Sequence, residues 1–202
     1  MKSDALAAGP DGRPRCFWAV GGAPEYVVYH DEEWGRPVLT DDGLFERLTL
    51  EAFQSGLSWL TILRKRPAFR AAFAGFDPEV VATYGDSEVE RLLEDTGIVR
   101  SRAKIEATIT NARALLRLRA AGGHLAELVW AFAPTGDPRP RPRSLAEVAA
   151  VTPASTALAR ELRSVGFRFV GPTTAYAFMQ AMGLVDDHLD GCHVPPAVSS
   201  RP

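Results

Sequence analysis

The chain contains few cysteines and no long hydrophobic run. Its two cysteines, Cys16 and Cys192, are too few for a disulfide framework in a protein of 202 residues. No apolar run approaches the roughly 20 residues of a membrane helix, and residues 1–15 lack the apolar core of a secretory signal. We therefore expect no membrane contact and a cytoplasmic protein.

Lysine is scarce as well. Only three of the 23 basic residues are lysines, and the arginines gather in stretches 64–66, 100–104, 139–143 and 160–168. Such clusters can bind phosphates from one face of a protein whose net charge is only −2. A GC-rich genome gives the same arginine excess, so composition leaves both explanations open.

Alternating β-type patterns are almost absent, which predicts an all-α fold. Helical signals run from residue 41 onward, among them an N-cap at Asp77-Pro78 and an amphipathic helix over residues 103–119. Ser87 and Ser144 each precede a glutamate by three positions, the spacing of a capping box. Residues 134–143 are too rich in proline for a helix. Residues 1–15 are small, polar and rich in glycine and proline, and we expect a disordered tail there.

The stretch from Leu44 to Arg66 contains a carboxylate in apolar surroundings. Glu51 shares a helical face with Leu44 and Leu48, and a burial without a partner costs several kcal/mol. A glycine break at Gly56 and an indole at Trp59 follow closely. One interpretation is a core carboxylate held by a buried arginine. The other is a pocket with an acid as its floor and a tryptophan as its wall.

Residues 162–175 predict a helix, a tight hairpin bracketed by Gly166 and Gly171, and a second helix with Pro172 at its first position. The free N–H groups at that helix start, beside Arg168, would suit a phosphate. This arrangement is typical of a helix-hairpin-helix DNA-backbone binder, but a simple helix connector fits the pattern equally well.

The two ends of the chain each contain a cysteine and a histidine. Cys16 and His30 lie early, whereas His188 and Cys192 lie late and four residues apart. Two cysteines and two histidines would complete a closed, structural zinc site. The spacing matches no common zinc finger, and other histidines are present, so the pattern alone leaves the ligand set open.

Taken together, these segments resemble the 3-methyladenine DNA glycosylase I family from Cys16 to Cys192. The matching runs are Tyr29–Gly35, Leu50-Glu51, Gln54, Gly56–Trp59, Gly97-Ile98, Arg100, Arg102, Lys104-Ile105, Asn111–Arg113, Gly166–Gly171, Phe178–Gln180 and Asp187-His188. The resemblance implies a helix-hairpin-helix glycosylase fold with a zinc site that joins the N- and C-terminal segments. We expect one catalytic unit over residues 16–195, with a helical core at 41–183, a zinc-binding lobe from 16–40 plus 184–195, and a tail at 196–202.

The resemblance also implies a reaction and its site. The family excises 3-methyladenine from alkylated double-stranded DNA as the free base. Its base-contacting acid maps onto Glu51, and its structural zinc maps onto Cys16, His30, His188 and Cys192. The remaining base-binding residues are expected at Tyr26, Tyr29, Trp34, Gln54 and Trp59. The protein would act as a monomer on DNA in the nucleoid of a bacterial cytoplasm.

The residue types suit that chemistry. N3-methylation makes the purine cationic, and electron-rich rings favour a cation by cation–π stacking. A carboxylate at Glu51 would complement the charge and accept from the exocyclic amine, so we assign it recognition before general-base chemistry. Asp187 would orient the zinc ligand that follows it.

DNA contacts are expected at Gly166, Arg168, Gly171, Arg102 and Lys104. Leu57 is a candidate wedge for the gap that the flipped base leaves, with a core leucine as the alternative. No lysine lies in the 166–171 hairpin, so we expect no strand-cleaving lyase activity.

The sequence also departs from the family pattern. Ala52 replaces a usual glycine and is followed by the bulky Phe53, the Cys16–His30 gap has an extra residue, and His193 follows Cys192. Two other functions stay open: a lesion binder that does not excise, and a metal-dependent phosphohydrolase built on His30-Asp31 and Asp187-His188.

Overall fold

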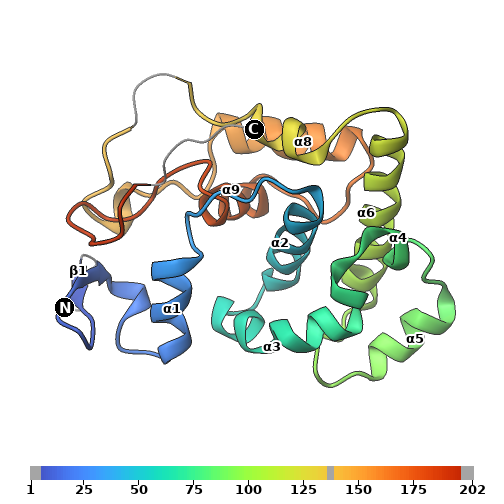
Figure 1. Ribbon diagram of the computed structural model, residues 1–202, viewed down its shortest axis with the longest axis horizontal. Coiled ribbons are helices and arrows are strands. Elements are labelled where there is room, and N and C mark those ends of the chain that lie inside the picture. The colour runs from blue at the N-terminus through green and yellow to red at the C-terminus, as the bar shows by residue number, and fades with distance from the viewer. Residues whose placement is uncertain (1–5, 136–138, 197–202) are drawn as a thin grey trace.

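The computed structural model describes residues 6–135 and 139–196 of the protein, and nearly all of its regular structure is helical (Figure 1). The α-helices are α1 (Pro24–Glu32), α2 (Asp41–Gln54), α3 (Trp59–Ala72), α4 (Pro78–Val81), α5 (Asp86–Glu94), α6 (Arg102–Ala120), α7 (Leu125–Trp130), α8 (Pro153–Ser164) and α9 (Pro172–Ala181). Three short 3-10 turns occur at Phe17–Ala19 (η1), Ala74–Phe76 (η2) and Leu145–Glu147 (η3). The all-α prediction is confirmed. Of the helices described, none has the length and apolarity to cross a bilayer.

Helix α2 lies in the middle of the molecule and forms the centre of its core (Figure 1). It begins at a Thr40 cap, whose hydroxyl accepts from the Gly43 N–H at 3.3 Å. Leu44, Leu48 and Phe53 are each no more than 1% exposed, and α2 packs against α3, α6, α7 and α9. The chain then reverses at Gly56, whose φ of 84° favours glycine. Both the buried helix and the glycine break agree with the sequence prediction.

The hairpin between α8 and α9 is tied to α6. Its two flanking helices pack against each other. The buried Asn111 side chain of α6 accepts from the Arg168 N–H at 2.6 Å and donates to the Arg168 carbonyl at 3.2 Å. Pro172 occupies the first turn of α9. The helix–hairpin–helix geometry is therefore present, and α6 fixes the hairpin backbone.

Two of the three predicted caps need correction. Asp77 caps α4 as predicted, accepting from the Glu79 N–H at 2.8 Å. Helix α5 instead begins one residue before Ser87, because Glu88 reaches back to the Gly85 N–H at 2.8 Å. Ser144 provides no side-chain cap for η3, and Glu147 accepts from the Arg143 N–H.

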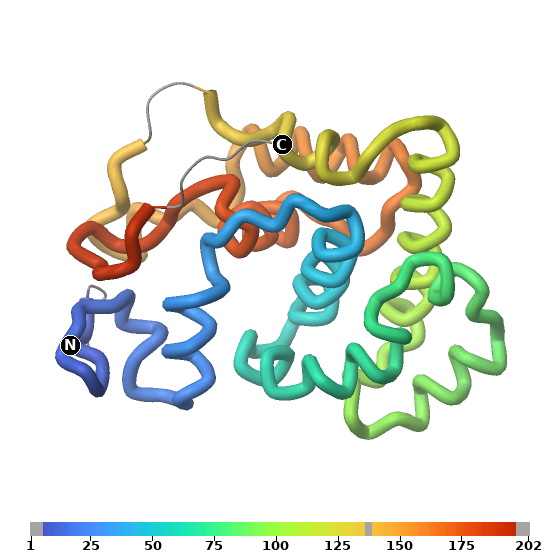
Figure 2. Tube along the Cα trace, in the orientation of Figure 1, coloured from blue at the N-terminus to red at the C-terminus, as the bar shows by residue number. Residues whose placement is uncertain are grey.

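The terminal segments meet on one side of the molecule, as the blue and red ends of the tube show (Figure 2). Strand β1 (Leu6–Ala8) pairs antiparallel with β2 (Pro14–Cys16), and the His193 N–H donates to the Pro14 carbonyl at 2.8 Å. The disordered tail predicted over residues 1–15 is therefore wrong for residues 6–15, whereas residues 1–5 and most of the tail predicted at 196–202 lie outside the described residues.

Charge neutralisation explains why the β-hairpin of β1 and β2 is ordered despite its small polar residues. The Arg15 guanidinium, 3% exposed, bridges Asp11 at 2.5 Å and Asp31 at 2.7 Å. A small apolar cluster of Cys16, Leu189, Cys192 and Val194 lies next to it. Helix α1 also forms within residues 16–40, where no helix was predicted. The domain boundaries themselves stay predictions.

Candidate functional site

A cavity of about 370 Å³ opens between α1, α2, the start of α3, α9 and the C-terminal segment. All six residues predicted to bind the base line it: Tyr26, Tyr29, Trp34, Glu51, Gln54 and Trp59. They come from three helices and one turn, so the fold brings together what the sequence spreads over 34 positions. Their roles toward a base stay predictions.

Glu51 is the buried acid of this cavity. It lies in the last turn of α2 and is 6% exposed, and its carboxyl has no hydrogen-bond partner within the described segments. Burial raises the pKa of Glu51 to about 8, although Arg47 one turn earlier partly offsets the rise. The alternative of a core carboxylate held by arginine does not fit, because Arg47 donates to Glu33 at 2.9 Å instead.

Aromatic rings form the walls. Tyr29 and Trp59 lie with their ring centroids 5.2 Å apart, and Trp18 meets Trp34 edge-on at 5.0 Å. The Tyr26 hydroxyl accepts from the Leu60 N–H at 3.0 Å, which joins α1 to the start of α3. Burial, helped by the charge of Glu51, holds the pKa of Tyr29 well above its usual range. Tyr29 is therefore a neutral phenol beside the acid.

Sequence reasoning assigned no base-binding role to several lining residues. They are Trp18, Ser58, Leu145, Val148, Ala177, Gln180, Asp187 and Leu189. Trp18 could have been found from its place two residues after Cys16, and Ser58 from its cap of α3, where it accepts from the Thr61 N–H. Leu145 and Val148 gave no signal, because only the tertiary fold brings their loop to α1.

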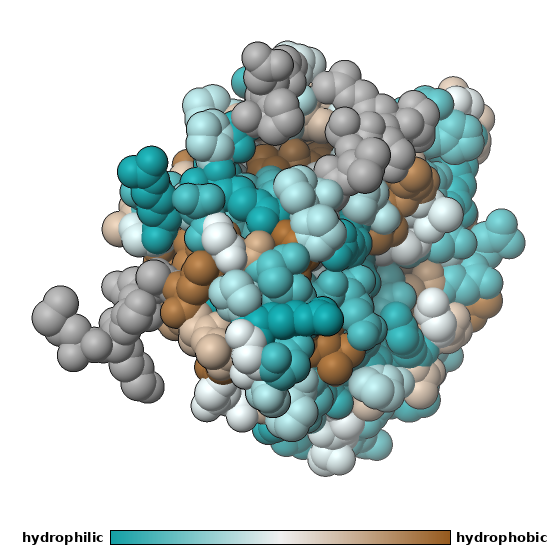
Figure 3. All heavy atoms as spheres, turned by 60° about the vertical axis from the view of Figure 1, so that its left-hand side comes forward, coloured by the Kyte–Doolittle hydropathy of each residue, from teal (hydrophilic) through white to brown (hydrophobic). Residues whose placement is uncertain are grey.

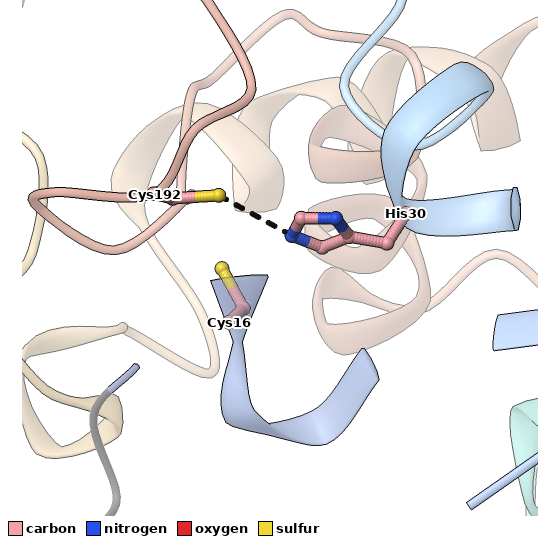
Figure 4. Close-up of side chains that lie close together, drawn as sticks. All are labelled: Cys16, His30 and Cys192. Atoms are coloured by element: carbon pink, nitrogen blue, oxygen red, sulfur yellow. Dashed lines mark hydrogen bonds between the residues drawn. The ribbon is translucent and has the colours of Figure 1, made fainter. Parts of the chain in front are cut away.

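A Cys/His cluster that could hold a metal lies beside the cavity. The Cys16, His30 and Cys192 ligand atoms all lie within 4.8 Å of one another and are buried. Figure 4 shows the three side chains converging from β2, α1 and the C-terminal loop, with the Cys192 sulfur 3.5 Å from His30 Nε2. The Cys16 thiol and His30 lower the pKa of Cys192, and the same contact together with burial raises that of Cys16.

In both predicted histidine ligands, the Nδ1 atom contacts a carboxylate. His30 Nδ1 lies 2.7 Å from Asp31 Oδ1, and His188 Nδ1 lies 2.9 Å from Asp186 Oδ1. The His188 ring packs 5.0 Å from that of His30, and its Nε2 is buried with no partner among the described residues. His188 lies outside the group of three residues whose ligand atoms are all within 4.8 Å of one another, but an orphaned buried nitrogen beside the His30 ring fits a fourth metal ligand.

The prediction that Asp187 orients His188 is wrong, because Asp186 does so. Asp187 instead accepts from Tyr176 and Gln180 on the cavity side.

A second possible metal group, formed by His30, Asp31 and His193, is less suitable. Asp31 Oδ1 already contacts both imidazoles, at 2.7 and 3.2 Å, and the Arg15 guanidinium occupies the same carboxylate. A cation there would face a buried arginine. Among the described residues, Asp31 and Asp187 both accept hydrogen bonds from protein donors, so neither presents the open metal site that a phosphohydrolase requires.

The predicted DNA-contacting residues fall into two groups. Gly166, Arg168 and Gly171 line a 550 Å³ depression next to the hairpin, which Arg163 and Thr174 also line. Arg168 is exposed, and its guanidinium has no partner within the described part of the chain. Phe169 beside it is 44% exposed with a φ of 55°. Sequence reasoning missed this exposed ring.

Arg102 and Lys104 are engaged elsewhere. The Arg102 guanidinium pairs with Glu90 at 2.6 Å, and Lys104 Nζ donates to the Phe53 and Ser55 carbonyls at 2.9 and 2.7 Å. Lys104 therefore caps the C-terminus of α2, where a cation is favourable. Leu57 is 42% exposed, so the alternative of a core leucine is wrong.

The face on which the terminal segments come forward is mainly hydrophilic, with apolar side chains showing between the polar ones (Figure 3).

Comparison with known proteins agrees with these features. Residues 18–195 match the methyladenine glycosylase family. The chain is 47% identical over 178 residues to DNA-3-methyladenine glycosylase 1 of Escherichia coli (strain K12), covering 88% of this chain and 95% of that one.

Solved structures are similar as well. A crystal structure of 3-methyladenine DNA glycosylase I superposes with a TM-score of 0.86 at 49% identity and covers 90% of this chain and 100% of that one. A Staphylococcus aureus 3-methyladenine DNA glycosylase I, solved to show its recognition of 3-methyladenine, gives a TM-score of 0.83 at 35% identity, covering 88% of this chain and 95% of that one.

Proposed function

The chain belongs to the methyladenine glycosylase family, and we propose that the cavity around Glu51 binds the base that it excises. The reaction is hydrolysis of the N-glycosidic bond of 3-methyladenine in alkylated DNA. One observation supports the site above all others: a buried acid that accepts no hydrogen bond from any described residue forms part of a cavity that tyrosine and tryptophan rings line. Such a cavity is complementary to a flat, cationic purine.

The cavity selects the lesion through its charge. Methylation at N3 leaves the purine positively charged, and the rings of Tyr29 and Trp59 attract a cation more than a neutral base. Flipping out a damaged base costs only a few kcal/mol, because its pairing is already weak. Neutral adenine pays the larger flipping cost and gains less in the cavity, so it is rejected.

The ionisation of Glu51 is coupled to binding. With a pKa of about 8, the carboxyl of the empty cavity is mostly protonated at neutral pH. A cationic base within contact distance lowers that pKa, since an opposite charge favours the carboxylate. Glu51 therefore loses its proton when the charged base binds, and the resulting carboxylate complements the positive charge of the base.

The protein's contribution to bond breaking is mainly binding. In hydrolysis, the oxygen of water joins C1′ of the sugar, the C1′–N9 bond breaks, and the proton that the water loses passes to solvent. The bonding electrons neutralise the methylated ring, so the leaving group is already activated. Interactions that hold the flipped nucleotide in a strained geometry then suffice to accelerate the step. The hairpin lacks a lysine, so no covalent intermediate with strand cleavage is proposed.

The Cys/His cluster would hold a structural zinc ion through Cys16, His30, His188 and Cys192. Sulfur and imidazole donors in a closed, buried set suit tetrahedral zinc, which would supply a crosslink between the chain termini and no step of hydrolysis. Asp31 and Asp186 hold the two imidazoles by Nδ1, which leaves His30 Nε2 at 3.5 Å from the Cys192 sulfur and His188 Nε2 buried and unpaired among the described residues.

DNA would lie across the hairpin, with the phosphate backbone at Arg168 and the N-terminus of α9. The exposed Leu57, next to the Gly56 turn, would fill the gap left by the flipped base. Because the Arg102 side chain is paired with Glu90, we rank Arg168 as the stronger phosphate contact.

Base release from methylated duplex DNA, separated by chromatography, tests the proposal. We expect wild type to release free 3-methyladenine, and Glu51→Gln and Trp59→Ala to release it far more slowly. A folded wild-type protein that releases no base would contradict the glycosylase assignment. Release that both substitutions leave unchanged would keep the activity and reject the cavity as its site.

A further inference from the structure

The cavity wall contains a pair of polar side chains besides Glu51 and Gln54. Gln180, at the end of α9, and Asp187, in the segment that follows, both line the cavity. The Asp187 side chain is fully buried and is surrounded by donors. Its Oδ2 accepts from the Tyr176 hydroxyl at 2.7 Å and from Gln180 Nε2 at 2.8 Å, and its Oδ1 accepts from Arg139.

These contacts determine which way the Gln180 amide points. The Asp187 oxygens accept from the Tyr176 hydroxyl, from Arg139 and from Gln180 Nε2, so the half of the amide that faces Asp187 is the NH₂ group. The carbonyl oxygen, Oε1, is then left without a hydrogen-bond partner in the described segments. Because Gln180 lines the cavity, this oxygen is an acceptor available to whatever occupies the cavity.

An acceptor fixed at this wall distinguishes purines by the group at position 6. Adenine derivatives bear an exocyclic amine there, which has two N–H donors, whereas guanine derivatives bear a carbonyl oxygen. The amine can donate one N–H to Gln180 on α9 while the other faces Glu51 on α2. A guanine would place its oxygen against the Gln180 oxygen, and two buried acceptors without a proton between them are costly.

We propose that Gln180 is a specificity-determining residue whose side-chain oxygen accepts from the exocyclic amine of the bound base. Asp187 is its positioning residue and prevents the amide from flipping. The inference rests on the cavity being the base-binding site. It adds a second acceptor to Glu51 and explains why Asp187, one residue before a proposed metal ligand, has its hydrogen bonds on the cavity side.

Free-base binding, followed by tryptophan fluorescence, tests this assignment. The ligands are 3-methyladenine and 3-methylpurine, which lacks only the exocyclic amine. In wild type we expect removal of the amine to weaken binding by about tenfold or more. In Gln180→Leu the same change should weaken binding by less than about threefold, because the partner of the amine is gone. Gln180→Met, closer to glutamine in length, serves if the leucine variant fails to fold.

A merely structural role for Gln180 gives a different result. Both ligands would then bind more weakly by the same factor, the ratio between them would match wild type, and the proposal would be overturned. Gln54→Leu is the matched comparison, since it removes the same amide from another wall where no carboxylate fixes it. A loss of amine selectivity in Gln54→Leu but not in Gln180→Leu would also reject the assignment.

Asp187→Asn tests the positioning role. The asparagine NH₂ can donate to Gln180 Oε1, which would turn the Gln180 NH₂ group toward the cavity. We expect the amine selectivity to fall as in Gln180→Leu, and binding of 3-methylguanine relative to 3-methyladenine to rise. Unchanged selectivity in a folded Asp187→Asn protein would reject the positioning role.

If the cavity is not the base-binding site, the binding experiment gives a different result. Wild type would then bind neither ligand, or Glu51→Gln would leave both affinities unchanged. The Gln180 assignment alone fails when wild type binds 3-methyladenine in a Glu51-dependent way and the selectivity ratio does not respond to Gln180.

Discussion

The cavity around Glu51 and the Cys/His cluster are neighbours, and each contains a buried titratable residue that is not fully hydrogen-bonded within the described part of the chain. In the cavity this is Glu51, whose carboxyl accepts no hydrogen bond, and in the cluster it is His188, whose Nε2 is buried and unpaired. Their surroundings differ. Glu51 is bounded by aromatic rings and accepts no hydrogen bond within the described chain, whereas His188 has its other nitrogen fixed by Asp186 and packs against Trp34.

This difference shows what kind of ligand each region suits. A metal ion that stays bound requires donors held rigidly by a second layer of carboxylates, as in the cluster. A base that enters and leaves with each turnover suits an acid whose charge changes when the ligand arrives. Without a ligand, the burial of the Glu51 carboxyl therefore destabilises the fold. In the cluster, a bound metal would stabilise the fold instead.

Removal of the proposed zinc ion should have the largest effect. Because the ligands come from β2, α1 and the C-terminal segment, we expect chelation to lower the melting temperature by about 10 °C or more. Activity should fall together with the circular dichroism signal and not before it. Loss of activity at full folded signal would indicate a catalytic metal and break the comparison.

A pair of histidine variants identifies the ligand set. His188→Ala should reduce the zinc content of the purified protein, whereas His193→Ala, the matched control, should leave it at one ion per chain. The opposite result would favour the group that contains Asp31.

Glu51→Gln should produce the next largest effect, on activity. Loss of the carboxylate removes the charge that complements the cationic base, and we expect excision to slow by on the order of 100-fold. Single-turnover kinetics on methylated DNA measure it. Excision within about threefold of wild type would show that the rings alone recognise the lesion.

The same substitution should stabilise the protein at alkaline pH. Between pH 4.5 and about 8, folded Glu51 keeps a proton that the unfolded chain has released, so its contribution to stability falls as pH rises across this window. Glu51→Gln removes this dependence, and we expect a gain of about 2 kcal/mol near the upper end of the window.

Urea unfolding of both proteins at the two ends of the window checks this, with the difference between them isolating Glu51 from other titrating groups. A difference that does not grow with pH would show that Glu51 has an ordinary pKa.

Much of the fold and of the cavity could be predicted, for identifiable reasons. The apolar spacing around Leu44 and Leu48 predicted a buried helix that presents Glu51, and the Gly166 and Gly171 positions predicted the hairpin. These signals are local, since periodicity and turn chemistry act over a few residues.

The errors involve contacts between distant segments. Arg15 is ordered by Asp31, sixteen residues away, so a composition typical of a tail misled the prediction for residues 6–15. Lys104 stays a predicted DNA contact, but its sequence position gave no sign that the carbonyls at the end of α2 lie within its reach. Neither partner is visible in the sequence around these residues.

Two adjacent carboxylates test the comparison between the cavity and the cluster through the smallest expected effects. Asp186 holds His188 in the cluster, whereas Asp187 holds Gln180 in the cavity. We expect Asp186→Asn to speed zinc release to a colorimetric chelator by about tenfold while base selectivity stays as in wild type. Asp187→Asn should change selectivity and leave zinc release within about threefold of wild type. If either variant changes both properties, the two regions form one coupled unit, and the cavity would owe part of its shape to the metal.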